Sequence, residues 1–430
     1  MINNEDVNVL VIGLGPAGIM ATYRLYNSNV SILAVDRGKP YFRRESTCPY
    51  DVANGFGGAG LFSDGKLSFF PAASNLWANT EKVKLRKSYD YVQTQLTPIG
   101  YRFPKWQNGW TITKPSMCTT DMEKYYKTTY FDEQERTSFV ENMYNHIQPV
   151  TKLCTEVLRI DKYKGLYHAI LNNDVNGLST VIARRIILAT GKAGNIIFDS
   201  FFGSNFSYIH RYEGGIRIET NSDNFKPFDF EQIDYKFIEK IGDLEFRTFC
   251  SCKNGKVLQS NYIRNVSYNG SISSKPTGRS NIGMIIRSEN KECKISQELI
   301  SCVGRNDSYV YDYDEDYDIE RNYWIGTEFD KLLSERLKVV LKSIKSKHEI
   351  KIYGPEIEYF GKYPVFNWST LKSSNEKVWI VGDLSCKYRG IVAALLSGVY
   401  AANEVVFDCM KNENTTIYDY DRKIPLLSSN

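Results

Sequence analysis

Histidine is scarce in this sequence, and no segment is rich in lysine and arginine. The 430 residues include four histidines, none close to another, and the 54 basic residues are interspersed with 50 acidic ones. Metal sites need ligands at short spacings, and nucleic-acid sites need a basic patch. We therefore expect neither a metal ion nor a nucleic acid among the ligands of this protein.

The sequence also lacks the marks of secreted and membrane proteins. The nine cysteines show no disulfide framework spacing, and the N-terminus is polar rather than signal-like. The most apolar late stretch, residues 390–407, contains Ser397, Asn403 and Glu404, which favours a buried helix over a membrane span. We expect a cytoplasmic protein of two or three domains that has no membrane partner.

The first motif with a chemical meaning lies near the N-terminus. Apart from Asn8, residues 7–12 are apolar and mostly β-branched, which predicts a strand buried on both faces. The strand is followed by Gly13-Leu-Gly15-Pro-Ala-Gly18 and then by a helical pattern. Gly13 permits a tight turn, Gly15 lets the backbone approach a pyrophosphate, and Gly18 lets helix and strand pack closely. The N-terminus of the helix then offers free N–H groups to the phosphates.

A second buried strand is predicted over residues 30–35 and ends in Asp36 and Arg37. An acid at this distance from the glycine turn accepts hydrogen bonds from ribose hydroxyls. Together the two strands and the turn predict a Rossmann-type dinucleotide site. Its expected residues are Gly13, Gly15, Pro16, Ala17, Gly18, Asp36 and Arg37.

Two later segments favour FAD over NAD as the dinucleotide. Residues 184–191 resemble the strand and Ala-Thr-Gly turn of FAD-containing reductases, and residues 378–391 resemble the C-terminal flavin motif of the same superfamily. This resemblance implies that Asp383 binds the ribityl chain and that the following helix directs its N-terminus at the pyrimidine side of the flavin. A helix N-terminus there would stabilise the negative charge of the reduced ring. The expected residues of this half of the FAD site are Ala189, Thr190, Gly191, Gly382, Asp383, Arg389, Gly390 and Ile391.

No second strand-linked GxGxxG motif occurs later in the sequence. A permanent NAD(P)H domain is therefore not expected. NAD(P)H would act as a transient electron donor, or an external reductase would supply the electrons.

A closer resemblance lies in residues 57–67, Gly-Gly-Ala-Gly-Leu-Phe-Ser-Asp-Gly-Lys-Leu. This segment resembles the GGxGxFSDGKL loop of the uncharacterised FAD-dependent dehydrogenases called NAD(FAD)-utilising. Residues 215–219, 249–257, 269–281 and 382–398 resemble further segments of that family, although Ser251, Lys253 and Asn254 depart from it. The resemblance implies flavin redox chemistry. The loop residues expected at the cofactor are Gly58, Gly60, Leu61, Ser63, Gly65 and Lys66.

Four residues are candidates for catalysis: Lys66, Cys250, Cys252 and Arg217. Lys66 is either a group beside the flavin or the substrate, or a solvated lysine. Cys250 and Cys252 alternate on a predicted strand and form either a flavin-coupled dithiol or a pair of buried thiols, and the strain of a CxC ring favours buried thiols. Arg217, like Arg247 and Arg279, is either an anchor for a carboxylate or phosphate or a structural ion-pair partner.

The expected fold class is α/β, with a discontinuous Rossmann-type FAD-binding domain over residues 1–70, 150–205 and 352–430. Residues 71–149 form a mainly helical insertion, with helices predicted over 121–130 and 138–147, and residues 206–351 form a second, β-sheet-based capping or substrate domain.

The predicted function is a dehydrogenase or reductase that moves a hydride between flavin N5 and a small organic substrate. One alternative is a flavin-dependent monooxygenase or oxidase that uses dioxygen. The other is a non-enzymatic structural or redox-sensing flavoprotein. Besides the small-molecule substrate, the expected partners are an external reductase or a second copy of the chain.

Overall fold

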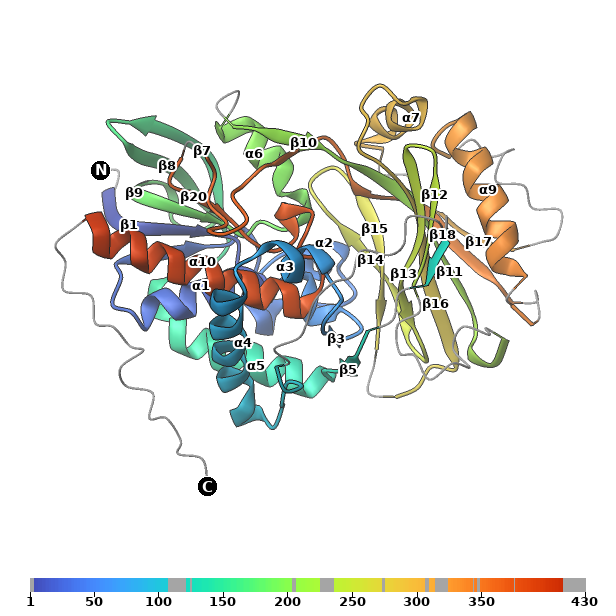
Figure 1. Ribbon diagram of the computed structural model, residues 1–430, viewed down its shortest axis with the longest axis horizontal. Helices are drawn as coiled ribbons and strands as arrows, with labels where there is room; N and C mark the ends of the chain where they lie inside the picture. Colours follow the sequence, from blue (N-terminus) through green and yellow to red (C-terminus); the bar gives the residue numbers. More distant parts are fainter. Residues whose placement is uncertain are drawn as a thin grey trace.

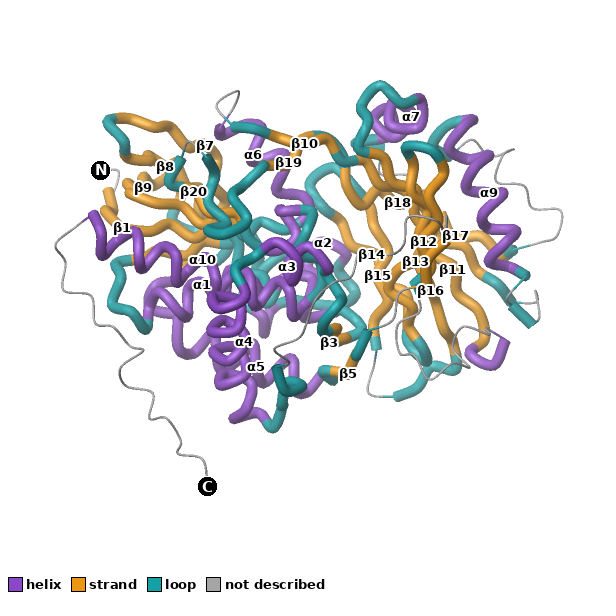
Figure 2. The backbone as a smooth tube through the Cα atoms, viewed as in Figure 1, coloured by secondary structure: helices purple, strands orange, loops and turns teal. Residues whose placement is uncertain are grey.

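The computed structural model describes residues 4–106, 121–123, 126–202, 206–224, 236–272, 275–305, 309–313, 324–342, 344–345, 349–374 and 376–412. Two seven-stranded sheets form its framework, one in each half of the molecule (Figure 1). Figure 2 shows the strands of the two sheets as separate groups, with helices and loops between them. This α/β architecture confirms the predicted fold class.

The first sheet has the strand order β6-β2-β1-β9-β8-β7, and β20 also pairs with β9. Its members are β1 (Asn4–Ile12), β2 (Ile32–Val35), β6 (Thr151–Lys152), β7 (Thr155–Tyr163), β8 (Leu166–Asn173), β9 (Gly177–Leu188) and β20 (Val378–Ile380). β1 pairs in parallel with β2 and β9, and β9 in parallel with β20. All four residues of β2 are buried, which explains the continuous apolar runs that parallel strands require.

Two helices pack against this sheet and against each other: α1 (Pro16–Tyr26), which links β1 to β2, and α10 (Ile391–Asn412). A Cβ on Gly398 would lie 2.1 Å from the carbonyl oxygen of Ala17, so the glycine permits the close approach of the helices. Within the described residues, α10 is long and apolar enough to cross a membrane, but 72% of its apolar window is buried inside the protein. It is longer than the buried helix predicted for this stretch.

The predicted insertion contains α3 (Ser74–Asn79), α4 (Lys82–Leu96) and α5 (Glu133–Ile147), whereas α2 (Pro49–Ala53) precedes it, within the first segment of the nucleotide domain. At the start of α5, Asp132 accepts from the backbone N–H of Glu135, whose carboxylate accepts from the N–H of Asp132. The helix predicted over 121–130 is wrong. This stretch contains β4 (Asp121–Glu123) and β5 (Thr128–Tyr130) instead, because β5 pairs with the distant β3 (Lys66–Ser68).

The second sheet has the strand order β17-β18-β11-β16-β13-β12-β4. Its further members are β11 (Tyr212–Asn221), β12 (Phe237–Ile241), β13 (Leu244–Cys252), β16 (Arg279–Ser288), β17 (Tyr309–Asp312) and β18 (Lys351–Tyr359). One face is apolar and packs on α7 (Lys294–Cys302) and α9 (Thr327–Leu341) at the outer side of the molecule (Figure 1). Because strand residues alternate between faces, the other face can carry charged side chains toward the first half.

The second sheet extends beyond the range predicted for it. β18 was assigned to the nucleotide domain, but it pairs with β11 and β17. The chain returns to the first sheet at β20. The remaining elements, α6 (Asn195–Phe202) and the two-stranded pairs β10 (Tyr208–His210) with β19 (Lys362–Pro364) and β14 (Lys256–Asn261) with β15 (Val266–Ser271), lie where the two halves meet.

Candidate functional site

A cavity of about 630 Å³ lies between the two halves and is lined by residues from both sheets. This volume is within the range of small-molecule and cofactor sites, roughly 300–1,000 Å³. Residues from the glycine turn after β1, the end of β2, residues 58–68, the end of β9 and the segment after β20 all contribute to its wall. The cavity therefore joins the motifs that are far apart in the sequence.

The glycine turn is shaped for close backbone contacts. Gly13 has a φ of +96°, and a Cβ there would lie 2.5 Å from the carbonyl oxygen of Ala189. A Cβ on Gly18 would lie 1.8 Å from the carbonyl oxygen of Gly13, and Gly18 does not line the cavity. Gly15 does line it, and its Cβ would meet a single neighbour within 4 Å, the Cα of Gly58 at 3.7 Å. Gly13 and Gly18 thus fold the turn, while Gly15 keeps its cavity side open.

The N-terminus of α1 opens onto the same cavity, because Pro16 and Ala17 are part of the wall. The first N–H groups of a helix have no partner within the helix and carry a partial positive charge. An oxyanion is the ligand that such an end favours.

Asp36, at the end of β2, holds the turn in place. Its carboxylate accepts from the backbone N–H of Leu14 at 2.7 Å and of Gly38 at 2.8 Å. Each carboxylate oxygen has a second acceptor site. Asp36 lines the cavity and can therefore accept further hydrogen bonds there. Arg37 also lines the cavity and donates to the side chain of Asn54 at 2.9 Å.

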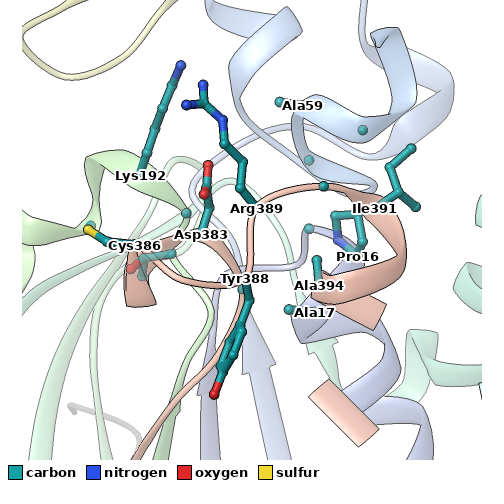
Figure 3. Close-up of a pocket in the computed structure, with 18 of the residues that line it drawn as sticks. Pro16, Ala17, Ala59, Lys192, Asp383, Cys386, Tyr388, Arg389, Ile391 and Ala394 are labelled. Carbon is teal, nitrogen blue, oxygen red and sulfur yellow. The ribbon is translucent and has the colours of Figure 1, made fainter. Parts of the chain in front are cut away.

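The other end of the cavity is formed by residues that follow β20. Gly382 has a φ of +63°, and the Asp383 carboxylate accepts from the hydroxyl of Tyr359. Figure 3 shows Asp383, Lys192 and Arg389 side by side in the pocket, while the ring of Tyr388 points away from them. After Gly390, which has a φ of +102°, the N-terminus of α10 begins at Ile391 on the cavity wall. Two helix N-termini thus face one cavity.

The predicted residues of the β9 turn, Ala189, Thr190 and Gly191, also line the cavity. The residues of the loop after α2 divide into two groups. Gly58, Gly60, Ser63 and Lys66 line the cavity, whereas Leu61 and Gly65 do not. Leu61 lies in a small apolar pocket with Phe139 and Ile391, and a Cβ on Gly65 would lie 2.0 Å from the carbonyl oxygen of Phe131.

Arg44 shapes the approach to this loop, a role that the sequence did not reveal. Its buried guanidinium donates to the backbone carbonyls of Asp51 at 2.9 and 2.6 Å, Phe56 at 2.7 Å and Gly58 at 2.8 Å. Burial lowers the pKa of Arg44 to about 10, although Asp36 and Asp51 oppose the shift. The side chain therefore replaces secondary structure as the partner of these carbonyls.

Lys66 and Cys250 meet at Asp64. The Lys66 ammonium lies 3.0 Å from a carboxylate oxygen of Asp64 and donates to the carbonyl of Ser251. The Cys250 thiol is 3.4 Å from the same oxygen of Asp64. Lys66 and Cys250 line the cavity, whereas Cys252 is fully buried behind it, and burial raises the pKa of its thiol well above the usual value. Of the four catalytic candidates, the structure therefore places two, Lys66 and Cys250, at the cavity wall.

Arg217, the fourth catalytic candidate, is fully buried and does not line the cavity. It donates to the carbonyls of Tyr268 and Cys250, both at 3.0 Å, and to the Asn281 side chain at 2.7 Å. Arg279 is also outside the cavity wall and pairs with Glu219 at 3.1 Å. Of the three candidate anchors, Arg247 reaches the cavity.

Lys192 and Glu358 are site residues that the sequence analysis missed. The buried Lys192 ammonium lies 2.5 Å from Glu358 and 4.4 Å from the centre of the Tyr262 ring. Arg389 donates to the other oxygen of Glu358. Burial opposes ionisation of Glu358, but the two cations lower its pKa to about 2. Only the position of Lys192, directly after the predicted Ala-Thr-Gly turn, could have indicated this role.

The parallel strands of the first sheet, the glycine turn and the two helix N-termini define a Rossmann-type dinucleotide-binding fold, with a second, antiparallel sheet over the cavity. The residues present fit FAD. An extended ligand would meet Asp36 at one end, the N-terminus of α1 in the middle, and Asp383 with the N-terminus of α10 at the other end. Such a ligand has sugar-like hydroxyls on both sides of a diphosphate.

No protein-family model matches the chain, and no curated protein matches its sequence. Among solved structures, a flavoprotein/dehydrogenase from Cytophaga hutchinsonii aligns with 95% of this chain and 80% of its own, with 14% identity and a TM-score of 0.42. A geranylgeranyl bacteriochlorophyll reductase-like protein from Thermoplasma acidophilum aligns with 96% of this chain and 81% of its own, with 12% identity and a TM-score of 0.42. CtdE, solved with FAD and a substrate, aligns with 94% and 84%, with 10% identity and a TM-score of 0.40. Because these sequence identities and TM-scores are low, the conclusions about this chain depend on its own geometry.

Proposed function

We propose that this protein is an FAD-dependent oxidoreductase. The observation that carries the proposal is that Asp36, Asp383 and the N-termini of α1 and α10 line one continuous cavity. A mononucleotide would need one carboxylate and one helix end. Two carboxylates and two helix N-termini on the wall of one cavity suit a dinucleotide, whose second half also carries hydroxyls.

FAD is favoured over NAD by the environment of the second half. α10 directs a partial positive charge into the cavity, and Lys192 and Arg389 lie beside Asp383 (Figure 3). A reduced flavin carries negative charge at its pyrimidine edge, and cations and a helix N-terminus stabilise that charge. The resemblance of residues 57–67 to the NAD(FAD)-utilising dehydrogenases supports the same assignment and stays a prediction.

Bound FAD supplies hydride transfer at its N5 atom, and the chain's own residues would bind and orient the reactants. Phe249 and Tyr359, from the second sheet, line the cavity close to Arg389, whose guanidinium carbon lies 4.9 and 5.5 Å from the centres of their rings. We propose a dehydrogenase or reductase of a small organic substrate that enters from the side of the second sheet.

The source of electrons is the second part of the proposal. The chain carries one glycine-turn fingerprint, so NAD(P)H would bind transiently or an external reductase would act. In place of an external reductase, a second copy of the chain, in a homo-oligomer, is the alternative partner.

The test begins with protein purified from a riboflavin-replete host. We expect yellow protein with one FAD per chain, bleached by photoreduction and slowly reoxidised by air. Colourless, folded protein that takes up no added FAD would contradict the proposal. Rapid reoxidation with substrate-dependent oxygen incorporation would favour a monooxygenase, and a flavin that no reductant or light bleaches would favour a structural role.

A further inference from the structure

The second sheet directs a charged face at the cavity. In β13, Glu245, Arg247 and Phe249 occupy alternate positions, with Phe246 and Thr248 buried between them, and all three line the cavity. Arg287 of β16 is directly opposite Glu245, and Glu213 of β11 is directly opposite Arg287. Paired residues on adjacent strands share a face, so these charges form one row across three strands.

The row continues into a chain of alternating charges. Arg247 lies 3.4 Å from Glu245, which lies 2.7 Å from Arg287, which lies 2.5 Å from Glu213. Glu213 is fully buried, and although burial opposes its ionisation, Arg211 and Arg287 hold its pKa well below the usual range. Glu213 is therefore charged at neutral pH.

Beyond Glu213, the row of alternating charges extends to residues of the loop after β20. Arg211 lies 2.5 Å from Glu213 and 2.8 Å from Glu289, which lies 3.8 Å from Lys387. Arg389 lies 3.4 Å from Glu213 and also reaches Glu358. All of these cations line the cavity.

The cations outnumber their carboxylates. Six cations share four carboxylates in these ion pairs, and the carboxylate of Asp383 lies beside two of the cations, Lys192 and Arg389 (Figure 3), which leaves a surplus of one positive charge. The cations are Lys192, Arg211, Arg247, Arg287, Lys387 and Arg389, and the carboxylates are Glu213, Glu245, Glu289 and Glu358.

Arg247 has one ion pair in this network, as Lys387 has, and it is the less exposed of the two. Its one ion pair is the 3.4 Å contact with Glu245, and its Nε, buried at the cavity wall, has no hydrogen-bond partner in the described part of the chain. Burial and the neighbouring Arg287 lower its pKa to about 9. A buried donor without a partner is costly, and an oxyanion beside it would remove that cost.

We propose that the substrate carries a carboxylate and that Arg247 binds it on the second-sheet side of the cavity. This inference rests on the proposed function and names the class of its substrate. The diphosphate of the cofactor does not account for the surplus, because its place is at the glycine turn of the first sheet, whereas Arg247 belongs to the second. A carboxylate matches the planar fork of a guanidinium. Phe249, whose ring lies 4.9 Å from the guanidinium carbon of Arg389, lines the cavity from the same strand as Arg247.

Benzoate and benzamide have the same shape and differ in charge, so they test the inference on the FAD-loaded protein. Binding is followed by the change in the visible flavin spectrum. We expect benzoate to bind at least about tenfold more tightly than benzamide, because one charge-assisted pair is worth at least that factor. Arg247→Gln should abolish the preference, and Arg247→Lys should keep part of it. The matched control is Arg279→Gln on β16, outside the cavity, which should bind both probes as the wild type does.

Equal binding of the two probes, or an unchanged preference in Arg247→Gln, would overturn the inference. So would competition by inorganic phosphate that is stronger than competition by acetate, since it would assign the site to a phosphate. Flavin content is measured first and separately. If no FAD binds, the proposed function fails, while calorimetry of benzoate and benzamide on the same protein still tests the role of Arg247.

Discussion

The different surroundings of Gly15 and Gly18 give a sharp test of the nucleotide site. Gly15 precedes α1 with φ −74° and ψ −175°, a conformation that alanine adopts without strain. Its new Cβ would lie 3.7 Å from the Cα of Gly58, an ordinary contact, and would otherwise project into the cavity. Gly15→Ala should therefore leave the protein without ligand almost as stable as the wild type, within about 1 kcal/mol for a weaker helix cap.

FAD binding should respond much more strongly to Gly15→Ala. The methyl group would hold a diphosphate away from the free N–H groups at the start of α1. Each hydrogen bond to a charged group is worth about 1.5–3 kcal/mol, so losing one raises the Kd for FAD at least about tenfold. The assay is titration of the flavin-free protein with FAD, together with thermal unfolding of the same preparation.

Gly18→Ala is the matched control, because its Cβ would lie 1.8 Å from the carbonyl oxygen of Gly13. The turn must then move, and we expect a loss of about 2–4 kcal/mol in the free energy of unfolding even without FAD. Wild-type FAD affinity in Gly15→Ala, or equal destabilisation by both substitutions, would refute the division of roles between the two glycines.

Three further predictions concern buried polar groups. Arg44→Met should lower the free energy of unfolding by at least about 2 kcal/mol in chemical denaturation, because it leaves backbone carbonyls of residues 51–58 without a donor, and unchanged stability would contradict this role. Burial, together with Glu358, raises the pKa of Glu356 to about 7, so the folded state should lose stability as pH rises from 5 to 7. Glu356→Gln should remove that loss, so its free energy of unfolding at pH 8 should be about 1–3 kcal/mol higher than that of the wild type. A pH dependence of stability equal to that of the wild type would contradict this role of Glu356. In alkylation at pH 8 followed by peptide mass analysis, Cys250 should react faster than the fully buried Cys252, whose burial raises its thiol pKa, and equal rates would show that Cys252 is accessible.

Local motifs predicted residues that the structure brings to one cavity. Of the predicted cofactor residues, all but Gly18, Leu61 and Gly65 line the cavity, and these three pack against neighbouring backbone or apolar side chains instead. A glycine pattern indicates the positions at which another group approaches the backbone closely. Whether that group is a ligand or a neighbouring part of the chain is decided by tertiary packing.

The errors lie where strands pair over long distances. Residues 121–130 have a helix-like composition. β5 nevertheless pairs with β3, because this pairing satisfies the backbone N–H and C=O groups of β5. β18 was placed in the nucleotide domain because it precedes β20, but its backbone completes the second sheet beside β11. Local propensity is weak compared with the backbone hydrogen bonds that a sheet edge offers.

By itself the sequence determined the dinucleotide fold, since turn conformation, strand burial and helix starts depend on neighbouring residues. The tertiary structure alone decided which charged residues share the cavity. Arg389 and Glu213 meet although 176 positions separate them, and Arg217 and Arg279, as plausible as Arg247 in the sequence, end up paired elsewhere. The physical reason is that a buried charge takes its partner from whatever strand lies opposite, and strand register is a property of the whole fold.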